Sequence, residues 1–234
     1  MIYSSAHRVL GGRIAHRAAL LGVLLLSVIV SPLSLASGGS RAAKTPVVPA
    51  KDAGAIDVPS GAYGLDKTHG YVTFSYSHLG FSNPEVGFND FDVDLKLDAN
   101  DLQNSSFQVS IAAASVDSRV DKFDEHLKAE GYFDVANHPE ITFTSTAIEM
   151  TSAQHANITG VLTIKGVAKS VTLHAVLNKA GMHPLRRVPA IGVSATATIL
   201  RTDWGLSKYV PMVSDEVTLS IEVELPKVAV ENSQ

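Results

Sequence analysis

Apolar and polar residues alternate along most of the chain after residue 70, in short runs that end at turn residues. The run 92–98 sets three apolar residues between charged ones, and the run 217–225 repeats the pattern over nine residues. Successive side chains of a strand point to opposite faces, so each run has one apolar and one polar face. The pattern predicts an all-β fold.

Eight segments carry this alternation. They are 70–76, 87–97, 105–115, 140–149, 156–164, 169–177, 189–200 and 215–225. Gly160 lies inside the fifth and predicts a bend or bulge, because glycine within a strand often marks one. Strands with one apolar face close well into a barrel, and about eight of them leave room for one small ligand. We therefore expect an eight-stranded antiparallel barrel that acts as a container.

One segment departs from the alternation. Ser118 stands three residues before Asp121, as at the start of a capped helix. Phe123 and Leu127 are four residues apart and would share one helix face. These positions predict one short helix at about 119–130, which would cover an end of the barrel.

The N-terminal residues have the features of an export signal. Three arginines precede an apolar stretch of 13 residues at 18–30, and small residues follow up to Ala36. Because a helix needs ~20 apolar residues to cross a bilayer, we expect a cleaved signal peptide at 1–36 and a periplasmic or secreted protein. An uncleaved N-terminal anchor is the alternative.

Composition divides the remainder of the chain into three parts. Residues 37–61 are rich in Gly, Ser, Ala and Pro, which predicts a flexible linker. The domain is expected at 62–226, and residues 227–234 are expected to form a frayed tail.

Charge limits the classes of possible partner, and cysteine content limits how the fold can be stabilised. Removal of residues 1–36 leaves 16 of the 19 basic residues against all 23 acidic ones. An acidic surface argues against nucleic acid and anionic membrane as main partners. The chain has no cysteine, so the fold depends on its core rather than on disulfides.

Short motifs follow one another in order across 62–226. They are Asp66-Lys67-Thr68-His69, His78-Leu79-Gly80-Phe81-Ser82, Gly87-Phe88-Asn89-Asp90-Phe91, Ser115-Val116-Asp117-Ser118, Tyr132-Phe133-Asp134, His138-Pro139-Glu140-Ile141-Thr142-Phe143, Gly160-Val161-Leu162-Thr163-Ile164-Lys165-Gly166-Val167 and Arg201-Thr202-Asp203-Trp204-Gly205. Together they resemble the YceI-like family of exported lipid- or polyisoprenoid-binding proteins. The chain departs from the family at Gly70, where Ser is usual, and at Val93, where Gly is usual.

The resemblance implies a lipocalin-like barrel with a helix at one end. It also implies a long-chain apolar ligand, either a polyisoprenoid, an isoprenoid quinone, or a fatty acid or amide. No cofactor is expected.

Bulky residues on the apolar faces are the candidates for contact with a ligand, together with His78 at the end of the first strand. The candidates are Phe74, Tyr76, His78, Phe91, Phe107, Val109, Ile111, Phe143, Leu162, Ile164, Leu173, Val193 and Trp204. The same positions would also fill a solid core, and strand parity does not separate the two arrangements. For His78, a role in the turn is favoured over contact with a ligand head group.

For the other polar residues, we expect structural roles. Arg201 and Asp203 flank the end of the seventh strand and are expected to pair with each other. The carboxylate of Asp215 would fix a corner before the eighth strand. Arg186 and Arg187 form a basic spot that we expect to lie in a solvated loop; a phosphate head group or a membrane surface is the alternative partner.

Motifs of catalysis and of resident metals are missing from the sequence. The histidines form no His-x-x-x-His or His-Glu-x-x-His set, and neither a Gly-x-Ser-x-Gly elbow nor a phosphate-binding glycine loop occurs. We therefore expect a binding protein rather than an enzyme. A solid interaction module, and an enzyme that uses His78, Asp203 or Asp215 as acid–base groups, are the alternatives. A homodimer and a transient membrane contact stay open.

Overall fold

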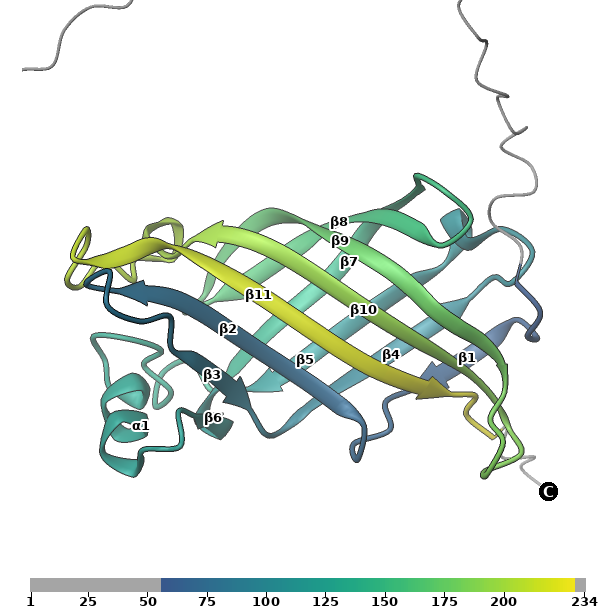
Figure 1. Ribbon diagram of the computed structural model, residues 1–234, viewed down its shortest axis with the longest axis horizontal. Helices are drawn as coiled ribbons and strands as arrows, with labels where there is room; N and C mark the ends of the chain where they lie inside the picture. Colours follow the sequence, from purple (N-terminus) through teal and green to yellow (C-terminus); the bar gives the residue numbers. More distant parts are fainter. Residues whose placement is uncertain (1–55, 230–234) are drawn as a thin grey trace, which may run out of the picture. The chain divides into compact units, whose positions relative to one another are not determined.

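The computed structural model describes residues 56–229, which form one antiparallel sheet and one α-helix (Figure 1). The strands are β1 (Gly61–Gly64), β2 (Gly70–His78), β3 (Glu85–Phe88), β4 (Phe91–Leu97), β5 (Ser106–Ala112), β6 (Val116–Asp117), β7 (Glu140–Met150), β8 (His155–Ile164), β9 (Val167–Met182), β10 (Pro189–Leu200) and β11 (Val213–Pro226). Their order in the sheet is β1-β4-β5-β7-β8-β9-β10-β11-β2-β3-β6. The helix is α1 (Asp121–Lys128), and short 3₁₀ turns are η1 (Leu102–Asn104), η2 (Ala113–Ser115) and η3 (Arg201–Trp204).

The all-β prediction is confirmed, but the predicted number of strands is wrong. Each of the eight predicted segments contains strand, yet residues 56–229 hold 11 strands. β1 and β6 are too short for alternation to reveal them. A break at 89–90 divides the predicted strand 87–97 into β3, which pairs with β2 and β6, and β4, which pairs with β1 and β5.

The sheet curls back toward itself. Tyr63 in β1, at one edge of the sheet, forms a bridge with Lys227, which directly follows β11. Next to it, the Val228 amide donates a hydrogen bond to the Ala62 carbonyl at 2.9 Å. The result is a curled antiparallel sheet of half-barrel form, seen in Figure 1 as long tilted strands around a common interior.

The apolar side of the curled sheet faces inward, as the alternation predicts. In β10, Ile191, Ala195, Ala197 and Ile199 are buried, whereas Thr198 between the last two is exposed. The same parity runs through β4 and β9. Burial of one side of nearly every strand provides the main stabilising free energy of the fold.

The irregularity predicted near Gly160 is present, although the extra residue lies in the partner strand. The pairing of β7 with β8 shifts between Ser145 and Ala147, opposite Gly160 and Thr159. The hydroxyl of Thr146, the bulged residue, donates to the Thr159 carbonyl at 3.1 Å.

The predicted helix is confirmed at α1, which lies at one end of the sheet beside β6 (Figure 1). Its predicted capping pair is wrong: the carboxylate that accepts the Ser118 amide, at 2.7 Å, belongs to Asp124 and not to Asp121. Asp124 is buried there and ties the segment before the helix to its first turn. Within 56–229, no helix is long and apolar enough to span a membrane.

The ends of the domain extend beyond the predicted boundaries. The predicted signal 1–36 and the linker up to residue 55 lie outside the described residues. The rest of the predicted linker is packed: Val58 is buried, and the Ile56 amide donates to the Ala99 carbonyl at 3.0 Å. Lys227 and Val228, predicted to fray, pair with β1 instead. Residues 230–234 of the predicted tail lie outside the described residues.

Candidate ligand cavity

The inner side of the curled sheet encloses a cavity of about 920 Å³. Its lining comes from nine of the 11 strands in residues 56–229, all except β1 and β6, and from α1 and the segment between β10 and β11. This volume lies near the upper end of the range for small-molecule sites, ~300–1,000 Å³. The interior is therefore hollow, and the alternative of a solid core is wrong.

All 13 residues predicted to line a ligand site do line this cavity. Two groups of aromatic rings form part of its wall. Phe107 and Phe143 stack with their ring centroids 5.6 Å apart. The ring centroid of Phe74 lies 5.8 Å from that of Phe88 and 6.0 Å from that of Phe133, and the Phe74 and Phe133 rings meet edge-on. Contact of these residues with a ligand stays a prediction.

His78 has the turn role that the sequence favoured, and it also lies at the cavity. Its backbone amide donates to the Ser82 carbonyl at 2.8 Å, and its carbonyl accepts from the Phe81 amide at 3.0 Å, so it closes the turn after β2. His78 is also among the residues that line the cavity, and its contact with a ligand head group stays a prediction.

The two ends of the cavity differ in chemistry. Every charged residue of the lining (Glu85, Lys122, Arg201 and Lys208) comes from α1, the start of β3 or the segment after β10, which gather at one end of the sheet (Figure 1). We call this the α1 end. Toward η1 and the β7–β8 hairpin, the lining consists of Ile56, Leu102, Met150 and similar apolar residues, with Gln154 and Ser105 as the polar ones.

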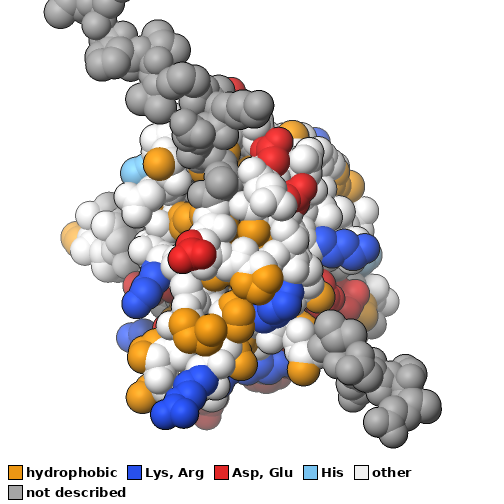
Figure 2. Space-filling model, turned by 90° about the vertical axis from the view of Figure 1, so that its right-hand side faces the viewer, with side chains coloured by type: hydrophobic (Ala, Val, Ile, Leu, Met, Phe, Trp, Pro, Cys, Tyr) orange, Lys and Arg blue, Asp and Glu red, His pale blue; other side chains and the backbone are white. Residues whose placement is uncertain are grey.

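Figure 2 faces the side of the molecule away from α1 and shows hydrophobic side chains beside Lys and Arg. The β9–β10 hairpin, at the right of Figure 1, contributes the exposed Met182 and Leu185. Neither of these two residues lines the cavity.

Tyrosines and a lysine cluster at the α1 end. The Lys208 ammonium lies 5.3 Å from the centroid of the Tyr132 ring, and the His126 ring lies 4.6 Å from the same ring. Burial raises the pKa of Tyr76 and of Tyr132. Sequence reasoning placed Tyr132 beside the helix but missed it and Lys208 as cavity residues, since both lie in irregular segments where alternation carries no information.

Arg201 shapes the rim of this end, and its predicted pairing with Asp203 is wrong. Its guanidinium donates to the carbonyls of Ser214 at 2.8 Å, Lys208 at 2.9 Å and Val213 at 3.0 Å, and also to that of Leu206. One side chain therefore holds the segment 206–214 in place.

Asp215 fixes the neighbouring corner, as predicted. Its carboxylate accepts from the Thr202 amide at 2.9 Å and from the Thr202 hydroxyl at 2.7 Å. These hydrogen bonds lower the pKa of Asp215. Trp204, 2% exposed and part of the lining, donates from its indole nitrogen to the Leu162 carbonyl at 3.3 Å.

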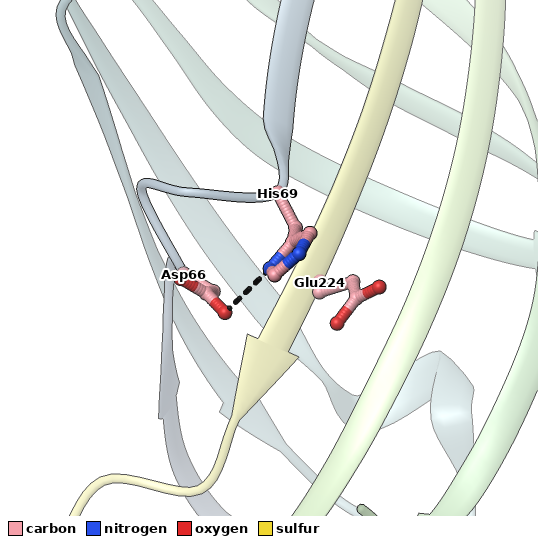
Figure 3. Close-up of side chains that lie close together, drawn as sticks. All are labelled: Asp66, His69 and Glu224. Atoms are coloured by element: carbon pink, nitrogen blue, oxygen red, sulfur yellow. Dashed lines mark hydrogen bonds and ion pairs between the residues drawn. The ribbon is translucent and has the colours of Figure 1, made fainter. Parts of the chain in front are cut away.

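A second polar cluster lies outside the cavity, where Asp66, His69 and Glu224 meet (Figure 3). One ligand atom from each lies within 4.8 Å of the others, a spacing that suits a metal ion. However, Oδ2 of Asp66 already contacts Nδ1 of His69 at 3.0 Å and the guanidinium of Arg186 at 2.8 Å. We interpret the cluster as an ion-pair network, because a cation would have to displace that guanidinium.

This network corrects the expectation for Arg186, which pairs with Asp66 instead of lying free in a solvated loop. Asp66 is only 4% exposed. Burial alone would raise the pKa of Asp66, but hydrogen bonds from His69 and Thr68 and the charge of Arg186 outweigh it and hold that pKa well below its usual range. The hydrogen bond to Asp66 in turn raises the pKa of His69.

Comparison with known proteins agrees with this architecture. Residues 63–225 match the YceI-like domain. The chain belongs to the YceI-like family. It is 35% identical to a UPF0312 protein of Azotobacter vinelandii over 173 residues, which are 73% of this chain and 90% of the relative. A UPF0312 protein of Ectopseudomonas mendocina is 34% identical over 164 residues, 69% of this chain and 85% of the relative.

Several solved structures share the fold of this chain. The YceI protein of Campylobacter jejuni is 29% identical, with a TM-score of 0.61 over 65% of this chain and 90% of its own. BcnA of Burkholderia cenocepacia has a TM-score of 0.63 at 24% identity, over 68% of this chain and 98% of its own. A polyisoprenoid-binding domain from Saccharophagus degradans has a TM-score of 0.57 at 13% identity, over 73% of this chain and 100% of its own.

Proposed function

We propose that this YceI-like protein binds a single long-chain apolar lipid within its cavity and carries or sequesters it. The candidate ligands are a polyisoprenoid, an isoprenoid quinone, or a fatty acid or amide. The observation that carries the proposal is the cavity of about 920 Å³, whose walls are aromatic and aliphatic over most of their length.

Burial of the ligand tail supplies enough free energy without specific polar contacts. Removing one CH₂ from water gains ~0.8 kcal/mol, so a prenyl unit gains roughly 3 to 4 kcal/mol before ordering costs. A few units therefore give useful affinity. Along the apolar walls, we expect the site to tolerate different tail chemistries.

An enzymatic role has less support from the positions of the three candidate acid–base groups. Asp215 is committed to Thr202, and Asp203 is exposed and absent from the cavity lining. His78 lines the cavity, but neither Asp203 nor Asp215 belongs to the lining. We therefore propose a binding protein and not a catalyst.

The location is proposed from the predicted signal peptide: the periplasm or the cell exterior. An aqueous compartment of this kind requires a protein that shields a lipid tail from water. The Saccharophagus domain that shares the fold is described as polyisoprenoid-binding. At 13% identity that likeness concerns the fold, so the proposal for this chain depends on its own cavity.

Trp204 provides the experimental readout, since it is the single tryptophan of the chain and lines the cavity. Delipidated protein is titrated with geraniol, farnesol and geranylgeraniol while its fluorescence is followed. The proposal predicts a saturable change, one lipid per chain, with affinity rising at each added prenyl unit. If neither the three alcohols nor hexadecanoate gives a saturable change, the proposal is overturned.

A further inference from the structure

The polar groups of the α1 end carry an inference about the head group of the ligand, which rests on the proposed function. Tyr76, Tyr132 and Tyr209 all line the cavity there. Within residues 56–229 none of their hydroxyls forms a hydrogen bond with the protein, whereas Tyr63, outside the cavity, donates to the Pro59 carbonyl at 2.7 Å. The lining therefore presents three phenol donors that are free for a ligand.

Two lysines add positive charge at the same end. Lys122 extends from α1 and Lys208 from the segment after β10, and both line the cavity. Within the described residues neither forms an ion pair, unlike Lys67, which pairs with Asp90 and Asp92, and Lys128, which pairs with Glu125. Arg201 is not available to a ligand in the same way, because its guanidinium is occupied by backbone carbonyls.

The charged residues that line the cavity at this end are mostly basic, although the chain as a whole is acidic. Glu85 is the single carboxylate of the described lining, against Lys122, Lys208 and Arg201. The opposite end offers no charged side chain. An amphiphile with an anionic head would therefore find charge-assisted donors at one end and apolar walls along the rest.

We infer that the cavity selects an amphiphile with an anionic head, a carboxylate or a phosphate ester, and holds that head at the α1 end between Lys122, Lys208 and the tyrosine hydroxyls. The tail then runs toward η1 and the β7–β8 hairpin. This orientation puts the ionised group on the donors and leaves the far end for methyl and methylene groups.

The test compares two lipids with the same tail, hexadecanoate and hexadecan-1-ol, by calorimetric titration of the full-length protein. Wild type is expected to prefer hexadecanoate. We expect the affinity for hexadecanoate to fall about tenfold in each of two variants, Lys208→Gln and Lys122→Gln, because each loses one charge-assisted hydrogen bond. The affinity for hexadecan-1-ol should not change in either variant. Lys96→Gln, on the outer side of β4 between the inward-facing Leu95 and Leu97, is the matched control and should change neither affinity.

Two further arms sharpen the result. Glu85→Gln removes the carboxylate and should strengthen hexadecanoate binding, an effect of opposite sign that a general loss of structure would not produce. Acetate, a carboxylate without a tail, should not compete; competition by acetate would mean a free-anion site and would overturn the inference.

The outcomes separate the two proposals. If both lipids bind alike and the lysine variants weaken both equally, the head-group inference is wrong and the lipid cavity stands. If neither lipid binds, the proposed function itself fails, and the inference fails with it.

Discussion

Phe143 lies directly against Gly160 across the β7–β8 pair. A Cβ atom at Gly160 would come within 2.2 Å of the phenyl Cζ and within 2.6 Å of the Thr144 carbonyl oxygen. The missing side chain lets the Phe143 ring turn over the strand and stack on Phe107, and both rings form part of the cavity wall. One glycine thus determines the shape of the aromatic wall next to the bulge at Thr146.

Gly160→Ala should destabilise the protein by about 2 kcal/mol, a typical cost of overpacking. The ring can move, but the Thr144 carbonyl belongs to the backbone, so the sheet itself must shift. Urea unfolding measures the effect. Gly87→Ala is the control, because its added Cβ would meet no atom closer than 3.9 Å. Equal stability of the two variants would contradict this account of the wall.

Ile221→Trp should block lipid uptake. Ile221 lines the cavity from β11, opposite Val72 of β2, so a larger side chain there occupies ligand space. We expect at least about a tenfold loss of affinity for farnesol in calorimetric titration, since each lost methylene contact counts for ~0.8 kcal/mol. Ser220→Trp places the same residue on the outer side of the strand and should bind as wild type does. Unchanged binding by Ile221→Trp would exclude this cavity as the lipid site.

Asp66→Asn should remove a pH-dependent part of the stability. The folded-state pKa of Asp66 is depressed, so its stabilising contribution is present above ~pH 4, the unfolded pKa, and is lost as the pH falls toward the folded pKa. The difference in Tm between wild type and Asp66→Asn should therefore be large at pH ~5 and shrink below pH ~4. His69, whose pKa is raised, contributes below its unfolded pKa of ~6.5 and loses that contribution as the pH rises through its folded pKa.

Thermal unfolding across this pH range, with Asp94→Asn as control, checks the network. Asp94 is an exposed carboxylate on β4 that forms no ion pair within residues 56–229. A Tm difference for Asp66→Asn that stays constant from neutral to acidic pH would show that the carboxylate is not stabilised by His69 and Arg186.

Arg201→Gln should loosen the rim at the α1 end. The substitution leaves several carbonyls of the segment 206–214 without their donor, which we expect to cost about 2 kcal/mol of unfolding free energy. Urea unfolding provides the measurement, with the exposed Arg187→Gln as control. A loss no larger than that of the control would mean that the segment holds its shape without the guanidinium.

Strand alternation predicted the regular part of the molecule well, because inward-facing side chains of a curled sheet are apolar at every second position. It identified the candidate wall from Phe74 to Trp204 for the same reason. It did not reveal β1 and β6, which have two to four residues and no measurable period. The break at 89–90 shows in the sequence only as a shift of the apolar positions from even numbers, Val86 and Phe88, to odd numbers, Phe91 and Val93, within a run that otherwise looks continuous.

The polar end of the cavity was harder to predict than its walls. Tyr132, Lys208 and Tyr209 lie in irregular segments, and the folded chain brings them together with α1. Arg201 was correctly singled out, but its partners are backbone carbonyls, which a sequence does not display. The Asp66–Arg186 pair joins residues far apart along the chain, so no local motif predicts it.

Native mass spectrometry of the protein as purified from cells, followed by analysis of an organic extract, tests the central claim most directly. The account predicts one long-chain lipid per wild-type chain, which the Ser220→Trp variant retains and the Ile221→Trp variant lacks. Wild-type protein that is repeatedly empty and takes up no added prenyl lipid or fatty acid would contradict it.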